Sequence, residues 1–294
     1  MDGVLVIDKP RGVTSFDVVA RVRRALRTKK AGHTGTLDPM ATGVLPICVG
    51  VATRVAGHIT LGEKAYEAEL RLGAETDTLD ADGKVVAEAP VPPGALSAEA
   101  LEAALSRFRG TFPQTPPMFS AVKIGGKRLY ELAREGVEVE RPAREVTVHE
   151  LTLREVTAEG FRFYVRCSKG FYVRTLAQEL GRALGTLAHL TALRRVQVGP
   201  FRIDQALSLD ALEREPSVAM GRLVGEAEAL SELPSFVVDA RDAERVKHGQ
   251  RLSGSGHPAG ERLRVMGPDD ALLALAEVEA SGRLRYLRVL AGGG

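Results

Sequence analysis

The residue types best suited to chemistry lie in residues 31–46, AGHTGTLDPMATGVLP, where glycines, prolines and small hydroxyl residues stand close together. That composition predicts a shaped loop rather than a helix or a strand. Asp38 lies in this loop with His33 upstream of it, so the loop could carry acid–base or nucleophilic chemistry. Taken alone, Asp38 followed by Pro39 is more typical of a plain turn, and His33 of a surface or hydrogen-bonded polar residue.

Sequence motifs for nucleotides and metals are absent, since the chain has no GxxxxGKS or GxxxxGKT loop, no GxGxxG after a strand and no HExxH. The six histidines do not cluster at ligand spacing, and the two cysteines, Cys48 and Cys167, are typical of small buried thiols. We therefore expect no metal, no structural zinc and no cofactor, and chemistry carried by side chains alone.

The segments that must position this loop predict strands and helices in mixed order. Residues 3–8 form a buried apolar run typical of a strand, and Thr14 with Asp17 forms a capping-box pattern that opens a helix. Alternation predicts a strand over 64–72. Because no βαβ unit repeats, the mixture predicts an α+β fold. Further predicted elements are a helix over 97–108, strands near 145–157 and 161–167, a helix over 172–184 and a strand around 195–201.

Domain organisation follows from length and from local composition. At 294 residues the chain exceeds the roughly 250 at which single cores stop growing, which predicts a large domain and a smaller one. A boundary is expected between about 225 and 236, giving domains over 1–230 and 236–294. The second domain is predicted to be β-rich, with VVDARDAERVKHGQRL among its short strands. Within the first, residues 113–128 hold three basic and no acidic residues between prolines and predict a flap.

The charge of the chain is unevenly distributed, although 40 Lys+Arg nearly balance 38 Asp+Glu. Residues 1–60 carry a net +5 and residues 162–195 a net +6, whereas residues 67–105 carry −7. If the two basic segments meet in the fold, they create a one-sided field suited to phosphate. The alternative is that these arginines lie on solvated faces balanced by acidic neighbours.

A globular protein of the cytoplasm is expected from composition and from the absence of targeting signals. Hydrophobic residues make up 44% of the chain and charged residues 27%, which is ordinary for soluble domains. No apolar run reaches the roughly 18 residues that span a bilayer. The N-terminus MDGVLVIDKPRG lacks the charged region and cleavage site of a signal peptide.

Several segments together resemble the TruB family of tRNA pseudouridine synthases. GHTGTLDPMATGVLP is similar to the signature loop of that family, VIDKPRGVTS to its N-terminal motif and KAYEAELRLG to its tyrosine-bearing strand. TDTLDADG resembles its acidic turn, PPMFSAVKIGGKRLYELAREG its RNA-clasping segment, and CSKGFYVRTLAQELG with ALRRVQVGPF its basic C-terminal motifs. The resemblance covers residues 3 to about 202, and more weakly HGQRL and ALLALAEVE resemble a PUA RNA-binding domain.

The resemblance implies isomerisation of uridine 55 in the T loop of tRNA to pseudouridine, without cofactor or metal, on a mixed, mainly antiparallel sheet. Asp38 corresponds to the essential aspartate, and Arg174 to the arginine that pairs with it. Tyr66 corresponds to the tyrosine that stacks on the detached uracil, near the carbon proton that leaves. Tyr172 and Leu193 correspond to walls of the pocket for the extruded base. Without the resemblance, Tyr66, Tyr172 and Leu193 would be typical core residues. Arg174 would be typical of a phosphate contact or of a surface charge.

Supporting roles are implied for other residues of the same motifs. His33 fills or braces the space that the extruded nucleotide leaves, and Lys9 with Pro10 supports the catalytic loop. Asp80 assists from the acidic turn, although an ordinary Asx turn accounts for it almost as well. In the RNA-clasping segment, taken as about 113–145, phosphate contacts are implied for Lys123, Lys127 and Arg128. Gly125 stands in that segment where asparagine is common in relatives.

Two alternatives remain open at this point. One is a non-catalytic protein that binds or folds tRNA on the same scaffold, which the presence of Asp38, Tyr66 and Arg174 disfavours. The other is a guide-RNA-dependent enzyme acting on ribosomal RNA, which the absence of basic tails and the intact clasping segment disfavour. We expect a monomer without an obligatory protein partner, because no long apolar face or heptad seam is evident.

Overall fold

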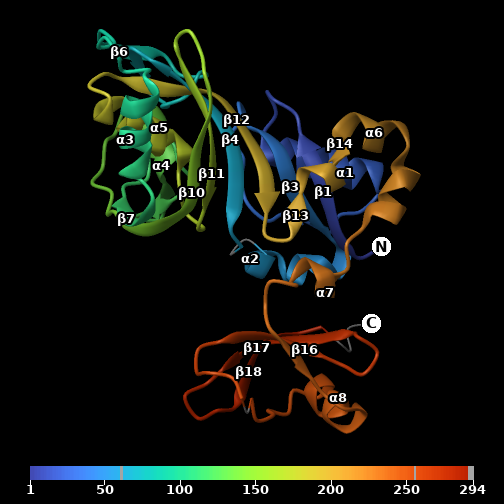
Figure 1. Cartoon of the computed structure of the whole chain (residues 1–294). Helices are drawn as coiled ribbons and strands as arrows, with labels where there is room; N and C mark the ends of the chain where they lie inside the picture. Colours follow the sequence, from blue (N-terminus) through green and yellow to red (C-terminus); the bar gives the residue numbers. More distant parts are fainter. Residues whose placement is uncertain (60–61, 255, 291–294) are drawn as a thin grey trace.

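The computed structural model describes residues 1–59, 62–254 and 256–290. A large body built on one broad sheet lies above a smaller body in Figure 1, and the chain passes from one to the other after α7 (Glu226–Ala229). No helix within the described ranges is long and apolar enough to cross a membrane.

The large body is organised around a ten-stranded sheet. Its strands follow the order β14-β1-β3-β12-β4-β11-β10-β7, with β2 beside β3 and β13 beside β12. All neighbours pair antiparallel except β12 with β3 and β14 with β1, which confirms the predicted α+β fold with a mixed, mainly antiparallel sheet. The strands are β1 Gly3–Lys9, β2 Ala31–His33, β3 Thr42–Val49, β4 Lys64–Leu72, β7 Gly110–Gln114, β10 Arg144–Val156, β11 Gly160–Cys167, β12 Ala188–Val198, β13 Phe201–Arg202 and β14 Leu207–Ser208.

Helices cover both ends of the sheet. In Figure 1, α3 and α5 lie near β10 and β11, whereas α1 and α6 lie near β1 and β14. The α-helices of the large body, besides α7, are α1 Ser15–Ala25, α2 Ala56–Ile59, α3 Ala98–Ser106, α4 Leu129–Arg134, α5 Val173–Ala183 and α6 Leu209–Arg214. Three 3-10 helices are η1 Gly50–Arg54, η2 Ile203–Gln205 and η3 Pro216–Arg222.

Alternating side chains give the sheet two hydrophobic faces. On β1, Leu5 and Ile7 belong to the main core, which also contains buried residues of α1, α3 and α5. Val4 and Val6 point the other way, into a second cluster with Phe201. Because both faces are covered, the strand reads as a continuous apolar run rather than an alternating one.

The helix after β1 begins where the sequence predicts. The Thr14 side chain accepts a hydrogen bond from the backbone N–H of Asp17, and the Asp17 carboxylate accepts one from the backbone N–H of Thr14. This reciprocal capping box fixes the first turn of α1. Ser15, the first helical residue, is thereby held against the loop that follows β2.

The predicted loop over 31–46 is shorter than expected, because strands occupy both of its ends. Ala31–His33 and Thr42–Val49 pair with each other, and the second segment also pairs with β1. Backbone pairing therefore overrides the local turn preference of Gly43 and Pro46. The loop itself spans 34–41. A second boundary was also wrong: the strand expected around 195–201 begins at Ala188 and ends at Val198, because its first half pairs with β4.

Two small hairpins project from the large body. The acidic turn lies between β5 (Ala74–Thr76) and β6 (Val85–Glu88). The basic segment forms the hairpin of β8 (Lys123–Ile124) and β9 (Lys127–Arg128). Gly125 and Gly126 between these strands both have positive φ, at 59° and 87°, as a tight turn with two left-handed residues requires.

The small body is a four-stranded sheet with one helix. Its strands follow the order β15-β16-β17-β18, and α8 contributes Ala243 and Val246 to its own core. The prediction of strands throughout VVDARDAERVKHGQRL was wrong, because Asp239 caps α8 by accepting from the backbone N–H of Asp242. The elements are β15 Ser235–Val237, α8 Ala240–Lys247, β16 Arg262–Met266, β17 Leu272–Val278 and β18 Leu284–Val289.

Candidate active site

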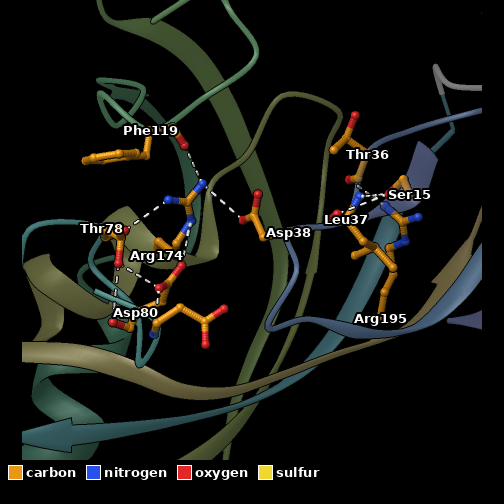
Figure 2. Close-up of polar contacts among 10 residues, drawn as sticks. Ser15, Thr36, Leu37, Asp38, Thr78, Asp80, Phe119, Arg174 and Arg195 are labelled. Carbon is orange, nitrogen blue, oxygen red and sulfur yellow. Dashed lines mark hydrogen bonds and ion pairs between the residues drawn. The ribbon is translucent and has the colours of Figure 1, made fainter. Parts of the chain in front are cut away.

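The loop over 34–41 carries Asp38 and is fastened from three sides. Ser15 of α1 donates to the carbonyl of Leu37 at 3.1 Å and accepts from its N–H at 2.8 Å. The ammonium of Lys9 donates to the carbonyls of Pro10, Val13 and Pro39. Figure 2 shows the contacts of Ser15 with Leu37 and of Arg195 with the start of the loop. Backbone groups on both sides of Asp38 are therefore held by buried side chains.

Asp38 and Arg174 form an ion pair, with 3.0 Å between Oδ2 and Nη2. The Arg174 side chain is only 5% exposed, whereas Asp38 is 36% exposed. Arg174 also donates to the carbonyls of Thr78, at 2.9 Å, and Phe119, at 2.7 Å (Figure 2). A guanidinium fixed by several acceptors holds the carboxylate in one orientation through a charge-assisted contact.

A second carboxylate, Asp80, lies 3.8 Å from Nε of Arg174 and is 6% exposed. It accepts hydrogen bonds from the hydroxyl of Thr78 and the backbone N–H of Asp82. Burial raises the pKa of Asp80, and the bond from Thr78 and the charge of Arg174 oppose that rise. The hairpin loop after β5 therefore brings a buried acid to the rear of the arginine.

Arg174 lies in the first turn of α5, after the N-cap residue Tyr172. A cation at this end of a helix is opposed by the helix dipole. The two carboxylates, Asp38 and Asp80, offset this repulsion. The position of Arg174 is thus explained by its partners rather than by helix formation.

Beside the ion pair lies a cavity of about 310 Å³. Five residues that the sequence analysis assigned to the site line it: Asp38, Tyr66, Tyr172, Arg174 and Leu193. They come from the loop after β2, from β4, from the start of α5 and from β12. The cavity therefore combines one carboxylate and its arginine with aromatic and apolar walls.

Tyr66 is 7% exposed, and burial raises the pKa of its phenol to about 12. Tyr172 is half-buried, and burial raises the pKa of its phenol as well. Both side chains therefore face the cavity as neutral phenols at neutral pH. The side chain of Gln114 bonds to the backbone N–H and carbonyl of Tyr172, which fixes the residue that precedes α5.

His33 and Lys9 lie outside the lining of this cavity. His33 ends β2 and is partly buried, and burial together with the nearby charge of Arg195 lowers the pKa of its imidazole. Lys9 is fully buried, and burial lowers the pKa of its ammonium to about 8. The carbonyl of Pro39 connects Lys9 with the residue after Asp38.

The basic residues Lys123, Lys127 and Arg128 are exposed on the β8–β9 hairpin. Lys127 lies 3.3 Å from a carboxylate oxygen of Glu135, and Arg128 donates to the phenol of Tyr130. Exposed pairs of this kind are weak. The segment that leads into this hairpin is connected to the site, since the carbonyl of Phe119, four residues before β8, accepts from Arg174.

The sequence analysis did not identify three residues that hold the site. Arg195 and Lys64 line the cavity, and Ser15 fastens the loop. Two consecutive arginines at 194 and 195 on a strand must face opposite sides of the sheet, which is a signal that one of them is buried. For Ser15 no signal existed, because its role depends on the packing of α1 against the loop.

The two basic segments of the sequence meet, since β12 pairs with β3. Four exposed arginines of residues 162–195, however, are paired with carboxylates, so the interpretation of balanced surface faces holds for these four. The pairs are Arg162 with Glu69 and Glu155, Arg166 with Glu63, Arg182 with Glu179, and Arg194 with Asp8. The arginines that remain inside, Arg174 and Arg195, belong to the cavity.

Comparison with known proteins places this geometry in a family. Residues 23–173 match the model of the TruB family pseudouridylate synthase N-terminal domain, and residues 174–231 match that of the tRNA pseudouridylate synthase B C-terminal domain. A tRNA pseudouridine synthase B of Geobacillus kaustophilus is 49% identical over 86% of this chain and 91% of its own. Its counterpart in Aromatoleum aromaticum is 46% identical over 99% of this chain and 93% of its own.

A solved structure has the same fold. A chain in the crystal structure of a Cbf5-Nop10-Gar1 complex matches with a TM-score of 0.77 and 26% identity, over 98% of this chain and 84% of that chain. The fold and the matching domain models define the class as pseudouridine synthases. Within that class, the chain belongs to the TruB family, as the two domain models and the relatives show.

Proposed function

We propose that this enzyme isomerises uridine 55 in the T loop of tRNA to pseudouridine. The observation that carries the proposal is the ion pair of Asp38 with Arg174, 3.0 Å long, at the wall of a 310 Å³ cavity. Relatives with 46–49% identity are named tRNA pseudouridine synthase B, which supports tRNA as the substrate.

The reaction breaks the bond from the sugar to N1 of uracil, forms a bond from the sugar to C5, and moves a proton from C5 to N1. A carboxylate beside the sugar supports this exchange without a cofactor or metal. Arg174 keeps Asp38 oriented before the nucleotide arrives, and Asp80 supports Arg174 from behind. Asp38 is the catalytic residue of this proposal.

The target base must leave the stacked T loop to reach Asp38, at a cost of a few kcal/mol. Tyr66, Tyr172 and Leu193 provide a partly aromatic cavity in which a detached planar base is retained and can turn. His33, neutral because its imidazole pKa is lowered, occupies the space that the extruded nucleotide leaves.

Binding of the rest of the tRNA is assigned to two regions. The β8–β9 hairpin, within the clasping segment of about 113–145, offers Lys123, Lys127 and Arg128 to phosphates. The catalytic domain comprises residues 1–230, and residues 236–294 form a PUA-like domain that adds RNA contacts. The four-stranded sheet with its own core supports treating the latter as a separate unit.

The stand-alone tRNA enzyme is favoured over a guide-RNA-dependent one. Solved structures of two H/ACA ribonucleoprotein complexes, one of them archaeal, match at 23–24% identity, whereas tRNA pseudouridine synthase B relatives match at 46–49%. We therefore propose an enzyme that acts on tRNA without an obligatory protein partner, and we further propose that it is a monomer and works in the cytoplasm.

The decisive experiment incubates the purified protein with an unmodified tRNA transcript, without added metal or cofactor, and maps pseudouridine chemically. We expect one new pseudouridine, at position 55, and none with Asp38→Asn. The variant should fold, with a loss of about 1 kcal/mol, because Arg174 keeps Asp80 and two carbonyls as partners. Salt-sensitive tRNA binding without any modification would instead favour the non-catalytic RNA-binding protein.

A further inference from the structure

Arg195 occupies the centre of the catalytic sheet. It lies on β12, directly opposite Tyr66 of β4 on one side and opposite Gly43 of β3 on the other. Its side chain is 1% exposed. A Cβ atom at Gly43, where φ is +101°, would collide with the backbone of Arg195, so the strand that leaves the catalytic loop approaches Arg195 as closely as only glycine permits.

The guanidinium of Arg195 is connected to both ends of the catalytic loop. It donates from Nη2 to the carbonyl of Gly35 at 3.2 Å and from Nη1 to that of Thr36 at 3.4 Å. Its Nε donates to the carbonyl of Val44 at 2.8 Å. The first two carbonyls precede Asp38 and the third follows it, so one side chain spans the loop.

These acceptors are neutral, and among the described residues no carboxylate pairs with Arg195. Its neighbour Arg194, in contrast, is 39% exposed and pairs with Asp8 at 2.8 Å. Burying a cation without a counter-ion is costly. Burial accordingly lowers the pKa of Arg195. Packing alone does not explain a charge at this position, since an apolar side chain of similar volume would avoid that cost.

Tyr66 is the remaining polar neighbour, because it lies directly opposite Arg195 on β4 and both residues line the same cavity. Arginine has only donors, so in a hydrogen bond between the two side chains the phenol oxygen is the acceptor. The proton of the phenol is then left for an acceptor in the cavity that Tyr66 lines. Arg195 thus fixes both the place of Tyr66 and the direction of its hydrogen bond.

We propose that Arg195 is a positioning residue of the isomerisation, which locks the catalytic loop to β12 and orients Tyr66 as a hydrogen-bond donor to the base. The division of work is symmetrical: Arg174 orients Asp38, and Arg195 orients Tyr66. The kinetic part of this inference rests on the proposed function, whereas the link between Arg195 and Tyr66 belongs to the protein without RNA.

The link is tested by placing 3-fluorotyrosine at position 66 and titrating it by fluorine NMR without RNA. In Arg195→Met the phenol loses a nearby cation, and we expect its pKa to rise. Arg194→Met is the matched control, since it removes the adjacent arginine of the same strand, and should leave the titration unchanged. An unaltered titration in folded Arg195→Met overturns the link.

Arg195→Lys separates charge from geometry and covers the case in which Arg195→Met does not fold. A lysine keeps the charge, so the titration of residue 66 should stay near that of the wild type. Its single ammonium cannot span the loop carbonyls and the phenol together. We expect single-turnover modification to slow about 10- to 100-fold, with the dissociation constant for tRNA within about twofold. A wild-type rate in Arg195→Lys overturns the positioning role.

A double variant tests whether Arg195 acts through Tyr66. In a Tyr66→Phe background the phenol is already absent, so Arg195→Lys should slow the reaction by a smaller factor than in the wild type. Equal factors overturn the assignment to Tyr66. If the wild type modifies no tRNA but the titration shift occurs, the proposed function fails and the link to Tyr66 stands.

Discussion

Arg174 is the residue on which the geometry of the site converges. It contacts Asp38 from the loop after β2, Asp80 from the acidic hairpin and the carbonyl of Phe119 from the clasping segment. These partners lie far apart in the sequence, in three separate segments of the chain. A displacement of any of them changes the contacts that hold Arg174 and therefore its hold on Asp38, so under the proposed function RNA binding at the clasping segment and chemistry at the carboxylate depend on one side chain.

Asp80→Asn tests this convergence. The folded environment raises the pKa of Asp80 through burial, so its ionised form is disfavoured in the folded state and the change to asparagine should alter the free energy of unfolding by less than about 1 kcal/mol. Arg174 loses the carboxylate of Asp80 as a partner. We therefore expect the activation free energy of single-turnover modification to rise by about 1.5–3 kcal/mol. Quenched single-turnover reactions measure the rate, and urea unfolding measures the free energy of unfolding.

Asp82→Asn is the matched control for Asp80→Asn. It changes an acid in the same turn, whose partner is the exposed Arg11 at 3.4 Å, and both rate and stability should stay near those of the wild type. A rate loss of similar size in Asp82→Asn would assign the effect to the turn and not to Arg174.

The residues of the site were predicted from sequence motifs and not from local physical chemistry. Asp38 is prominent as the acid of a glycine-rich loop, but nothing local relates it to Arg174, because the ion pair depends on how α5 packs beneath the loop. Tyr66 is indistinguishable from a core residue by alternation alone. Arg195 was visible only as a positive charge, since the sequence does not reveal which of two adjacent arginines faces inward.

At the scale of elements, α1 positions the loop that carries Asp38. Ser15→Ala removes both hydrogen bonds to the backbone of Leu37, which lies next to Asp38. We expect a loss of about 1–3 kcal/mol in stability, because a buried N–H and carbonyl lose their partner, together with slower single-turnover modification. Thr14→Ala serves as the control: it removes the N-cap at a cost of about 0.5–2 kcal/mol but leaves the loop contacts in place. Equal rate losses in the two variants would contradict a specific role for Ser15.

The β8–β9 hairpin gives the second expectation at this scale. Reversing two charges, in Lys123→Glu with Arg128→Glu, should weaken tRNA binding and reduce the slope of log affinity against log salt by about two. Filter binding across a salt series measures this slope. Arg107→Glu on the exposed C-terminal end of α3 is the control for a change in net charge. If the double variant keeps the wild-type slope, the hairpin does not contact phosphate.

The elements themselves were more predictable than the site. The capping box at Thr14 and the alternation over Lys64–Leu72 both agree with the structure, because each depends on local chemistry. The start of β3 at Thr42 was missed, because pairing with β1 outweighs a turn-like composition. The helix α8 was missed, because a cap and two buried side chains suffice for a short helix.

At the scale of the whole molecule, the two bodies share apolar contacts. Leu275 of the small sheet is buried in the cluster on the far face of the large sheet, with Val198, Phe201 and Leu230. The face that carries the cavity is thus the one away from the small body, since Tyr66 and Leu193 belong to the main core. Changes in the small body should accordingly reach the chemistry only through RNA binding or overall stability.

Overall stability should have an unusual dependence on pH, because buried bases and buried acids titrate in adjacent ranges. Burial lowers the pKa of Lys9 and of Lys64 from 10.5 to about 8. Between these values the unfolded chain binds more protons than the folded one, so the free energy of unfolding rises with pH, by about 1 kcal/mol per lysine from pH 8 to 9. Buried Cys48 and Cys167, with pKa raised from 9.0 to about 12, act in the opposite sense above pH 9, as Tyr66 does above pH 10.

We therefore expect the free energy of unfolding, measured with urea at constant salt, to rise from pH 7 to about 9 and to fall again above about 10. Replacing both cysteines by alanine removes the opposing thiols, so the rise should continue to higher pH in that variant. Lys9→Met should lose about half of the rise, since only Lys64 then releases its proton early. A free energy of unfolding that falls steadily from pH 7 would mean that neither the Lys9 nor the Lys64 ammonium is shielded from water. The support of the loop over 34–41 by a buried Lys9 would then be contradicted.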